Sequence, residues 1–258
     1  MDQHDTHLIT RLAETDADRR GAERLRYDVF VGELGGDGDL VDHANRLERD
    51  RFDDAADHLV LVDPRRDASA LDHVVGAYRL MPGDTAATLG GFYSEGEYDL
   101  SVLKSSGRTL LELGRSCVHP DYRGGTAMYQ LWNALAAYVE AKGAEILFGV
   151  ASFHGRDPMA IAPSLSLLHH AHLAPEELRV RAVASAFQPM DLVPRDQIDR
   201  LAAMRAVPAL IKAYLRLGGF VGEGAFVDHQ FNTIDVCLVM DTARLNARSH
   251  AIYTGGRL

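Results

Sequence analysis

The stretch ELGRSCVHPDYRGGTAMYQLW, residues 112–132, decides how the rest of the chain is interpreted. It begins as an apolar strand that nevertheless contains Glu112 and Arg115, three residues apart. A glycine turn at Gly124 follows, and then an amphipathic run over 126–142 that Gly143 closes, as expected of a helix. A glycine-rich turn that opens a helix presents backbone N–H groups able to bind a phosphate. The order of strand, glycine turn and long helix therefore indicates a phosphate-binding unit.

The charge pair at the start of this stretch predicts an irregular strand. On a regular strand, Glu112 and Arg115 would face opposite sides. Gly114 lies between them, and a β-bulge there would turn both side chains to one face and leave backbone N–H groups unpaired. Such a site suits acyl transfer, because a carboxylate can take a proton and free N–H groups can hold a carbonyl oxygen. A buried salt bridge without chemistry explains the pair equally well.

The remaining sequence mixes helices and strands. We expect hairpins near both ends, one from 58–63 and 73–81 and one over 226–241 with Asn232 in its turn. This pattern predicts a single α+β (mixed α/β) domain over 1–258 with a helical insertion at about 157–207. The other expected elements are helices over 21–34, 126–142, 157–178 and 194–219 (broken before Pro208) and strands over 109–118, 144–153 and 179–187.

Composition narrows the class of protein. The chain has 258 residues, 47% hydrophobic and 25% charged, as in ordinary globular proteins. The sequence contains no apolar run of the roughly 18–20 residues that span a bilayer, and its first 20 residues lack the apolar core of a signal peptide. We therefore expect a cytoplasmic protein.

The net charge of −10 is unevenly distributed. Residues 1–100 contain 23 acidic and 11 basic residues, whereas 101–258 contain 14 and 16. An acidic half could attract a cationic substrate beside a basic surface for an acidic partner, but an acidic surface that keeps the protein in solution is the preferred explanation. A nucleic-acid partner would require the opposite overall sign.

The cysteines and histidines do not indicate a metal centre. Cys117 and Cys237 lie in apolar, strand-like runs and are interpreted as small core residues, with a nucleophilic thiol as the weaker alternative. The histidines of LLHHAHL (167–173) have the spacing of no common metal site. We expect no metal.

Several motifs resemble a known superfamily. VHPDYRGG (118–125) resembles the pyrophosphate-binding signature of GCN5-related N-acetyltransferases (GNAT), with Thr126 where that pattern usually has glycine. The segment AYLRLGGF (213–220) resembles a later motif of the superfamily and places Tyr214 where many members have a tyrosine that protonates the leaving thiolate. A core residue on a helix is the alternative for Tyr214. The resemblance implies a central, mostly antiparallel sheet that is splayed at a bulged strand and flanked by helices.

Within this superfamily, two branches share further motifs with the chain. LRYDVFV, DRFDDAADHLVLVD, GAYRL and ELGRSCVHP resemble paired motifs of acyl-homoserine-lactone synthases. The matching positions are Arg26, Phe30, Asp50, Asp53, Arg79, Glu112 and Arg115. The resemblance is closer to ornithine-lipid N-acyltransferases, through LFGVASF-x-G-x-DP and PALIKAYLRLGGFVG-x-GA-x-x-D-x-QFNT-x-DV.

This resemblance implies transfer of a 3-hydroxyacyl chain from acyl-carrier protein to the α-amino group of L-ornithine, which gives lyso-ornithine lipid. Glu112 would then act as the base, directly or through a water, and Tyr214 would protonate the thiolate. Backbone N–H groups of Cys117 and Val118 would hold the oxyanion. The phosphate of the pantetheine arm would bind at Arg123, Gly124, Gly125 and Thr126.

Thr126 also bears on the acyl donor. The pantetheine arm of a carrier protein has a single phosphate. It therefore needs fewer phosphate-binding N–H groups at the glycine turn than coenzyme A does. The sequence therefore favours acyl-phosphopantetheine on acyl-carrier protein over a coenzyme A thioester, with no tightly bound cofactor. The proposed docking surface for the acidic carrier comprises Arg179, Arg181, Arg195, Arg200, Arg205, Lys212 and Arg216.

Two acidic groups could receive the acceptor. Asp50, Asp53 and Asp57 suit a cationic amino acid, but a structural network with Arg26 and Arg79 is the alternative and is preferred for Asp53, because arginines in apolar elements need partners. Asp228, Gln230 and Asn232 in the late hairpin could also contact the acceptor, with turn formation as the alternative.

Other functions remain open at this point. The chain could be a signal synthase of the homoserine-lactone type, another amino-acid N-acyltransferase, or a non-catalytic domain that binds acyl chains or carrier proteins. An amphiphilic product would also favour peripheral association with the inner membrane. Segment 157–178 is a candidate contact, although packing in the core is the preferred interpretation.

Overall fold

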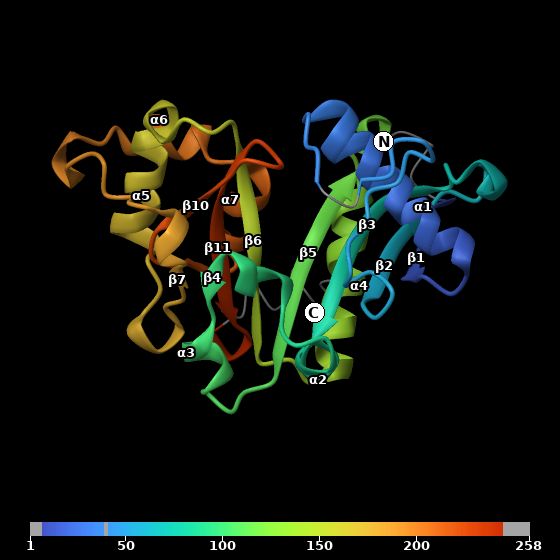
Figure 1. Cartoon of the computed structure of the whole chain (residues 1–258), viewed down its shortest axis with the longest axis horizontal. Helices are drawn as coiled ribbons and strands as arrows, with labels where there is room; N and C mark the ends of the chain where they lie inside the picture. Colours follow the sequence, from blue (N-terminus) through green and yellow to red (C-terminus); the bar gives the residue numbers. More distant parts are fainter. Residues whose placement is uncertain (1–6, 39–40, 245–258) are drawn as a thin grey trace, which may run out of the picture.

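The structure is a computed structural model that describes residues 7–38 and 41–244, and in this part of the chain nine strands form one sheet (Figure 1). The order is β1-β2-β3-β5-β6-β11-β10-β8, with β9 beside β11. All pairings are antiparallel except that of β5 with β6, which confirms the expected mostly antiparallel sheet. The strands are β1 (Ile9–Leu12), β2 (Asp57–Val62), β3 (Val74–Pro82), β5 (Leu110–Val118), β6 (Ile146–His154), β8 (Phe187–Gln188), β9 (Phe220–Val221), β10 (Ala225–Asp228) and β11 (Thr233–Asp241), and β4 (Tyr98–Asp99) pairs separately with β7 (Arg181–Ala182).

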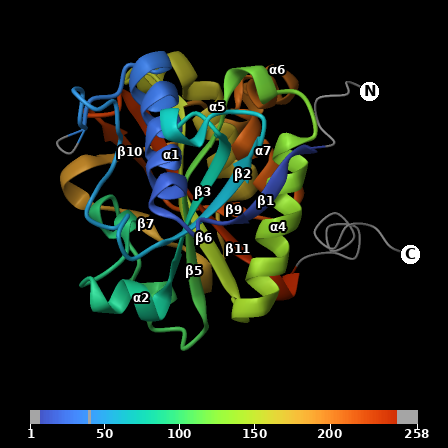
Figure 2. The same ribbon diagram turned by 90° about the vertical axis from the view of Figure 1, so that its right-hand side faces the viewer.

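Helices cover both faces of the sheet. One face packs against α4, α5 and α7 through Leu131, Leu165 and Ile211. The other face packs against α1 and, further along, against the segment around α3. Figure 2 shows α1 and α4 flanking β2 and β3. The helices are α1 (Asp16–Arg26), α2 (Gly83–Thr88), α3 (Ser101–Lys104), α4 (Ala127–Lys142), α5 (Ala162–His172), α6 (Arg200–Ala206) and α7 (Ala209–Arg216).

Most of the expected elements are present. The two hairpins form as β2–β3 and β10–β11, and α4 ends at Gly143 in a left-handed conformation. Helix α1 begins earlier than expected, because Thr15 and Asp18 form a capping box, and it continues as a π-helix over Tyr27–Glu33. The helical run 194–219 is broken at Pro208 as predicted.

One prediction was wrong. The expected strand over 179–187 is reduced to two-residue strands, β7 and β8, separated by a 3₁₀ turn over Ala184–Ala186. The segment packs at the margin of the sheet and pairs over too short a distance to form a full strand. The run 157–178 is a 3₁₀ turn followed by α5, whose Leu165 and Leu168 are fully buried, which confirms core packing there.

The sheet opens between β5 and β6, the two parallel strands. They pair only over Leu110–Glu112 and then diverge. A β-bulge lies on β5 just after this divergence, as shown by the shift in the register of β3 with β5 between Ala77 and Arg79. The bulge was expected at Gly114, but it is Arg115 that adopts a φ of 52°, whereas Gly114 pairs with Arg79. The predicted irregular strand is therefore present, one residue further along.

Gly149 of β6 lies just after the last paired residues of β5 and β6, where the two strands are still close together. A Cβ atom on Gly149 would lie 2.0 Å from the carbonyl oxygen of Leu113, so only glycine allows the two strands to approach there before they part. No helix in the described residues is long and apolar enough to span a membrane.

Candidate active site

A cavity of about 250 Å³ occupies the opening between β5 and β6. It is lined from both faces of the sheet, by Glu112 and Phe148 on one and by Leu113 and Leu147 on the other. We call it the central cavity. Its position between the two parting strands gives it lining side chains from both faces.

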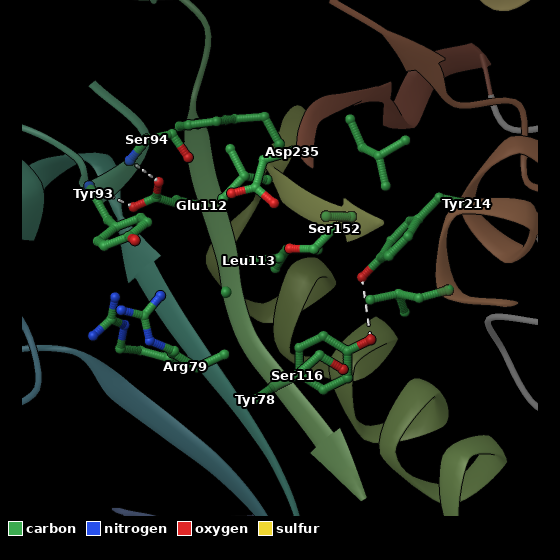
Figure 3. A pocket seen from close by; sticks show the side chains of 18 of the residues that line it. Tyr78, Arg79, Tyr93, Ser94, Glu112, Leu113, Ser116, Ser152, Tyr214 and Asp235 are labelled. Atoms are coloured by element: carbon green, nitrogen blue, oxygen red, sulfur yellow. Dashed lines mark hydrogen bonds between the residues drawn. The ribbon is translucent and has the colours of Figure 1, made fainter. Parts of the chain in front are cut away.

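Glu112 lies in this cavity and is held by the backbone. Its two carboxylate oxygens accept hydrogen bonds from the N–H groups of Tyr93 (3.0 Å) and Ser94 (2.7 Å), as Figure 3 shows. Burial raises the pKa of Glu112 above its usual range, although these N–H groups act in the other direction. A carboxylate fixed in position, with a raised pKa and two remaining lone pairs, is suited to accept a proton.

Arg115 lies on the same side of the strand as Glu112. Its guanidinium stands 4.4 Å from the centre of the Tyr93 ring, beside the N–H group that Glu112 accepts from. The bulge thus brings both side chains to one face, as the sequence predicted. Arg115 is held there by Glu48 and Asp50, each at 3.1 Å.

Three arginines and three carboxylates form a connected network next to the cavity. Arg26 binds Asp53 through two hydrogen bonds (2.6 and 2.9 Å), and Arg79 binds Asp50 (2.6 Å) and Asp53 (3.3 Å). Burial acts to raise the pKa of Asp53, but Arg26 and Arg79 hold it well below its usual range. The preferred interpretation of Asp53 as a network residue fits these contacts.

Glu48 completes the network and was missed by the sequence reasoning. It is buried and accepts a hydrogen bond from Arg26 at 2.5 Å. It lies in an acidic, loop-like segment, where nothing in the local pattern distinguishes it from exposed acids. Only the tertiary structure shows that it faces two arginines.

Tyr214 lines the cavity from α7. Its hydroxyl donates a hydrogen bond to the hydroxyl of Tyr78 (3.3 Å), which also accepts one from the indole N–H of Trp132 (3.2 Å). Figure 3 shows Tyr214 across the cavity from Glu112. A phenol in this position is placed to give a proton to a group on the side of the cavity opposite the base. Sequence reasoning did not identify Tyr78.

The glycine turn before α4 has the expected backbone form. Gly124 has a φ of 79°, which favours glycine. Thr126 occupies the N-cap position of α4, and its hydroxyl accepts a hydrogen bond from the Gln130 side-chain amide. The guanidinium of Arg123, however, makes two hydrogen bonds to Glu33 (2.7 Å each) and one to the Val118 carbonyl. A phosphate at this turn would have to share Arg123 with Glu33.

Cys117 and Val118 lie on the part of β5 from which β6 has diverged. Both are buried, and burial raises the pKa of the Cys117 thiol to about 12, so this side chain is a poor nucleophile at neutral pH. Their suggested contribution comes from the backbone and not from the side chains.

The predicted acceptor residues are not all at the cavity. Asp228 lines it, but Asp57 instead binds the Tyr138 hydroxyl (2.6 Å) and Lys142 (3.4 Å) on α4, so the structure does not support a role for Asp57 in acceptor binding. Gln230 and Asn232 form the β10–β11 turn, with Asn232 at a φ of 55°, and do not line the cavity. Turn formation, the alternative interpretation, accounts for both.

Asp235 lines the same cavity and was also missed. It is the third residue of β11, between Ile234 and Val236. An acidic residue within an apolar strand was the signal that drew attention to Glu112, and it could have identified Asp235 too.

Comparisons with known proteins agree with this geometry. A family model described as an acetyltransferase (GNAT) domain matches residues 25–133. Two solved structures share the fold. One is FeeM, an N-acyl amino acid synthase from uncultured soil microbes (TM-score 0.53, 10% identity, 92% of this chain and 91% of that chain). The other is the acyl-homoserine lactone synthase BjaI (TM-score 0.51, 15% identity, 93% and 82%). The fold and the matched family model together indicate a protein of the GNAT class.

Curated relatives narrow this class. The chain is 61% identical over 95% of its length to an L-ornithine N(alpha)-acyltransferase of Rhodobacter capsulatus, covering 93% of that protein. It is 40% identical to the protein of the same name from Brucella abortus, over 95% of this chain and 88% of that one. The chain belongs to the L-ornithine N(alpha)-acyltransferase family.

Proposed function

We propose that this protein transfers a 3-hydroxyacyl chain from acyl-carrier protein to the α-amino group of L-ornithine, which gives lyso-ornithine lipid. The observation that carries the proposal is the 61% identity to the Rhodobacter capsulatus L-ornithine N(alpha)-acyltransferase along nearly the whole chain. The central cavity supports it, because a base and a phenol face it from opposite sides.

The chemistry follows from the positions of these groups. The ornithine α-ammonium loses a proton to Glu112, directly or through a water, and the neutral amine attacks the thioester carbonyl. Backbone N–H groups of β5, around Cys117 and Val118, hold the oxyanion. The carbon–sulfur bond then breaks and Tyr214 gives its proton to the thiolate. The second proton that the nitrogen loses restores the phenol, so an amide, a free thiol and protonated Glu112 remain.

The donor arm is placed by the glycine turn. In this proposal its phosphate binds at Arg123, Gly124, Gly125 and Thr126, at the start of α4, where the helix dipole favours an anion. Thr126 in place of glycine favours the single phosphate of a carrier-protein arm over coenzyme A.

The test is a donor and acceptor panel. Purified protein is incubated with 3-hydroxyacyl-carrier protein or the matching coenzyme A thioester and with ornithine, lysine, homoserine lactone precursor or tyrosine, and the products are identified by mass spectrometry. We expect an ornithine amide formed from the carrier-protein donor. A product on another amine, or formed only from coenzyme A, would overturn the corresponding part of the proposal.

Peripheral membrane association forms a separate part of the proposal. Met159 and Leu201 are 64% and 81% exposed, on the helical part of the chain between β6 and β9. Large apolar side chains on a surface can insert into the headgroup region of a membrane. Flotation with vesicles of anionic lipid tests this, with Met159→Ser and Leu201→Ser expected to reduce binding.

A further inference from the structure

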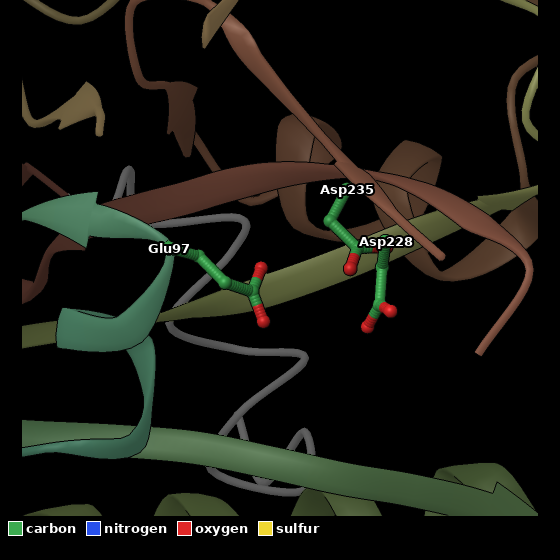
Figure 4. Close-up of side chains that lie close together, drawn as sticks. All are labelled: Glu97, Asp228 and Asp235. Carbon is green, nitrogen blue, oxygen red and sulfur yellow. The ribbon is translucent and has the colours of Figure 1, made fainter. Parts of the chain in front are cut away.

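Three carboxylates meet beside the central cavity, from three separate segments of the chain. Glu97 precedes β4, Asp228 ends β10 and Asp235 lies in β11 (Figure 4). One oxygen of each lies within 4.8 Å of the others. All three residues are at least nine-tenths buried. We call this group the acid cluster.

The acid cluster has no salt-bridge partner among the described residues, and two of its carboxylate oxygens are unpaired. Glu97 Oε2 and Asp235 Oδ1 accept no hydrogen bond from any described residue, and no lysine or arginine in the described part of the chain forms a salt bridge with the cluster. Asp228 differs, because its carboxylate accepts from the N–H groups of Gln230 and Phe231. A buried carboxylate without a partner is destabilising, so the fold tolerates a cluster that packing alone does not explain.

Two members of the acid cluster border the central cavity. Asp228 and Asp235 line the central cavity together with Glu112, and Figure 3 shows Asp235 beside Ser152 at this cavity. The hydroxyl of Ser94, which also lines it, is buried and has no partner among the described residues. The open acceptors therefore lie next to the proposed catalytic base.

We propose that the acid cluster binds the side-chain ammonium of the acceptor, and thereby selects a diamino acid over other amino acids. This inference rests on the proposed function. One amine of the acceptor must be neutral to attack, near Glu112, whereas the other remains protonated, since a primary alkyl ammonium has a pKa of about 10. That permanent cation needs a buried anionic partner.

The geometry suits an ammonium group. Its three N–H donors point to corners of a tetrahedron, so acceptors at about 2.8 Å lie about 4.6 Å apart. The three oxygens of the acid cluster, one from each residue, all lie within 4.8 Å of one another, which is compatible with this arrangement. Burial and mutual repulsion raise the pKa of Glu97 and bring that of Asp235 to about 6, consistent with a site whose cation is supplied by the ligand.

A divalent metal ion is the competing occupant. Ca²⁺ and Mg²⁺ bind through six or more oxygens and strongly favour several carboxylates together. One oxygen of the cluster, Asp228 Oδ1, already accepts from two backbone N–H groups, and the positive charge of Arg115 acts on Glu97 and Asp235. These features favour the monovalent organic cation.

The experiment compares ornithine with norvaline, which has the same carbon chain without the side-chain amine. Steady-state kcat/KM is measured with both acceptors for the native protein, Asp235→Asn and Glu97→Gln. We expect the native protein to prefer ornithine at least 100-fold, and each variant to lose about 100-fold with ornithine while norvaline changes less than threefold. Equal losses with both acceptors, or no native preference, would overturn the inference.

Asp241→Asn is the matched control. Asp241 lies on the same strand and is also buried, but it binds Arg108 (2.6 Å) outside the cavity. Its substitution should leave the ornithine-to-norvaline ratio unchanged, and thermal melting shows whether any variant is unfolded. A change in this ratio in the control would show that the ratio reports general damage, and would count against the inference.

The remaining outcomes separate the two proposals. If the native protein acylates ornithine and the variants keep the full preference for ornithine over norvaline, only the acid-cluster inference is refuted. Native protein that acylates neither ornithine nor norvaline refutes the proposed function and the inference together. Loss of activity on treatment with EDTA, restored by Mg²⁺ or Ca²⁺, with calorimetric metal binding abolished in Asp235→Asn, would assign the cluster to a metal and overturn the inference.

Discussion

Two groups of buried charges lie beside the central cavity, and they differ in balance. The arginine–carboxylate network around Arg26 has three cations and three carboxylates, each with a partner in the protein. The acid cluster around Asp235 has three carboxylates and no salt bridge among the described residues. Buried charges that are fully paired hold a structure in place, whereas unpaired ones indicate a ligand. We therefore interpret the arginine–carboxylate network as structural support for the site and the acid cluster as a binding surface.

Breaking the balanced network should have the largest effect. Arg26→Ala leaves Asp53 and Glu48 buried without their main partner, so we expect a loss of about 3–5 kcal/mol in the free energy of unfolding. Urea denaturation followed by circular dichroism measures it. Arg24→Ala, two residues earlier on α1, removes only exposed hydrogen bonds to Asn45 and Arg46 and should cost under about 1 kcal/mol. Equal losses in the two variants would contradict the network's structural role.

Removal of the base should act on rate and leave the fold intact. Glu112→Gln keeps the size and one carbonyl acceptor, but its NH₂ group faces one of the two backbone N–H donors. We therefore expect kcat to fall about 10²- to 10³-fold, with a protein that remains folded at reduced stability. Because burial raises the pKa of Glu112 and the base must be unprotonated, the native kcat/KM should rise with pH through that raised pKa. The rise should disappear in Glu112→Gln. A variant with native kcat would exclude Glu112 as the base.

The fold could be predicted from the sequence because its signals are local. The hairpins at β2–β3 and β10–β11 follow from apolar runs around turn residues, and α4 follows from its periodicity and Gly143. The prediction of a strand over 179–187 failed because the alternation of apolar and polar residues there is short, and a run of that length can form a turn as easily as a strand. Glu112 and Arg115 were found because charges are conspicuous in an apolar strand.

The acid cluster could not be predicted, since its members are distant in the sequence. Glu97 lies in the segment 82–108, where no period is evident, and nothing local indicates that it faces Asp228 and Asp235. Glu48 was missed for the same reason. Conversely, Asp57 looked like a member of the acidic site but points to α4, because β2 begins there and turns its side chain away from the cavity. Charge content is visible in a sequence, but partners depend on tertiary structure.

Neutralising one carboxylate of the acid cluster should raise the free energy of unfolding of the protein without bound substrate. Burial raises the pKa of Asp235 to about 6 from an ordinary 3.8, beside Glu97, Asp228 and Arg115, so the folded state binds protons more tightly than the unfolded state. Stability should therefore fall as pH rises from about 4 to above 6. Asp235→Asn removes the penalty, so we expect a gain of about 1–3 kcal/mol at pH 8 and little change at pH 4. Urea denaturation at both values measures this gain.

The sign of that change distinguishes the two charge groups. Asp53→Asn, in the balanced network, should lower stability at pH 8, because its pKa is held below the usual range and its charge is favourable in the fold. If Asp235→Asn also lowers stability at pH 8, the acid cluster has partners of its own and the contrast fails.

Exposed arginines form a third kind of charge, and the smallest effect should come from them. Arg200 and Arg205 on α6 are exposed and form no salt bridge among the described residues. If they dock an acidic carrier protein, Arg200→Glu with Arg205→Glu should raise the carrier-protein KM about 3- to 10-fold at low salt, with the difference lost at high salt. Arg19→Glu with Arg20→Glu, exposed on α1, is the matched control and should leave KM unchanged. An equal response in both double variants would mean that net charge, and not a docking surface on α6, governs the encounter.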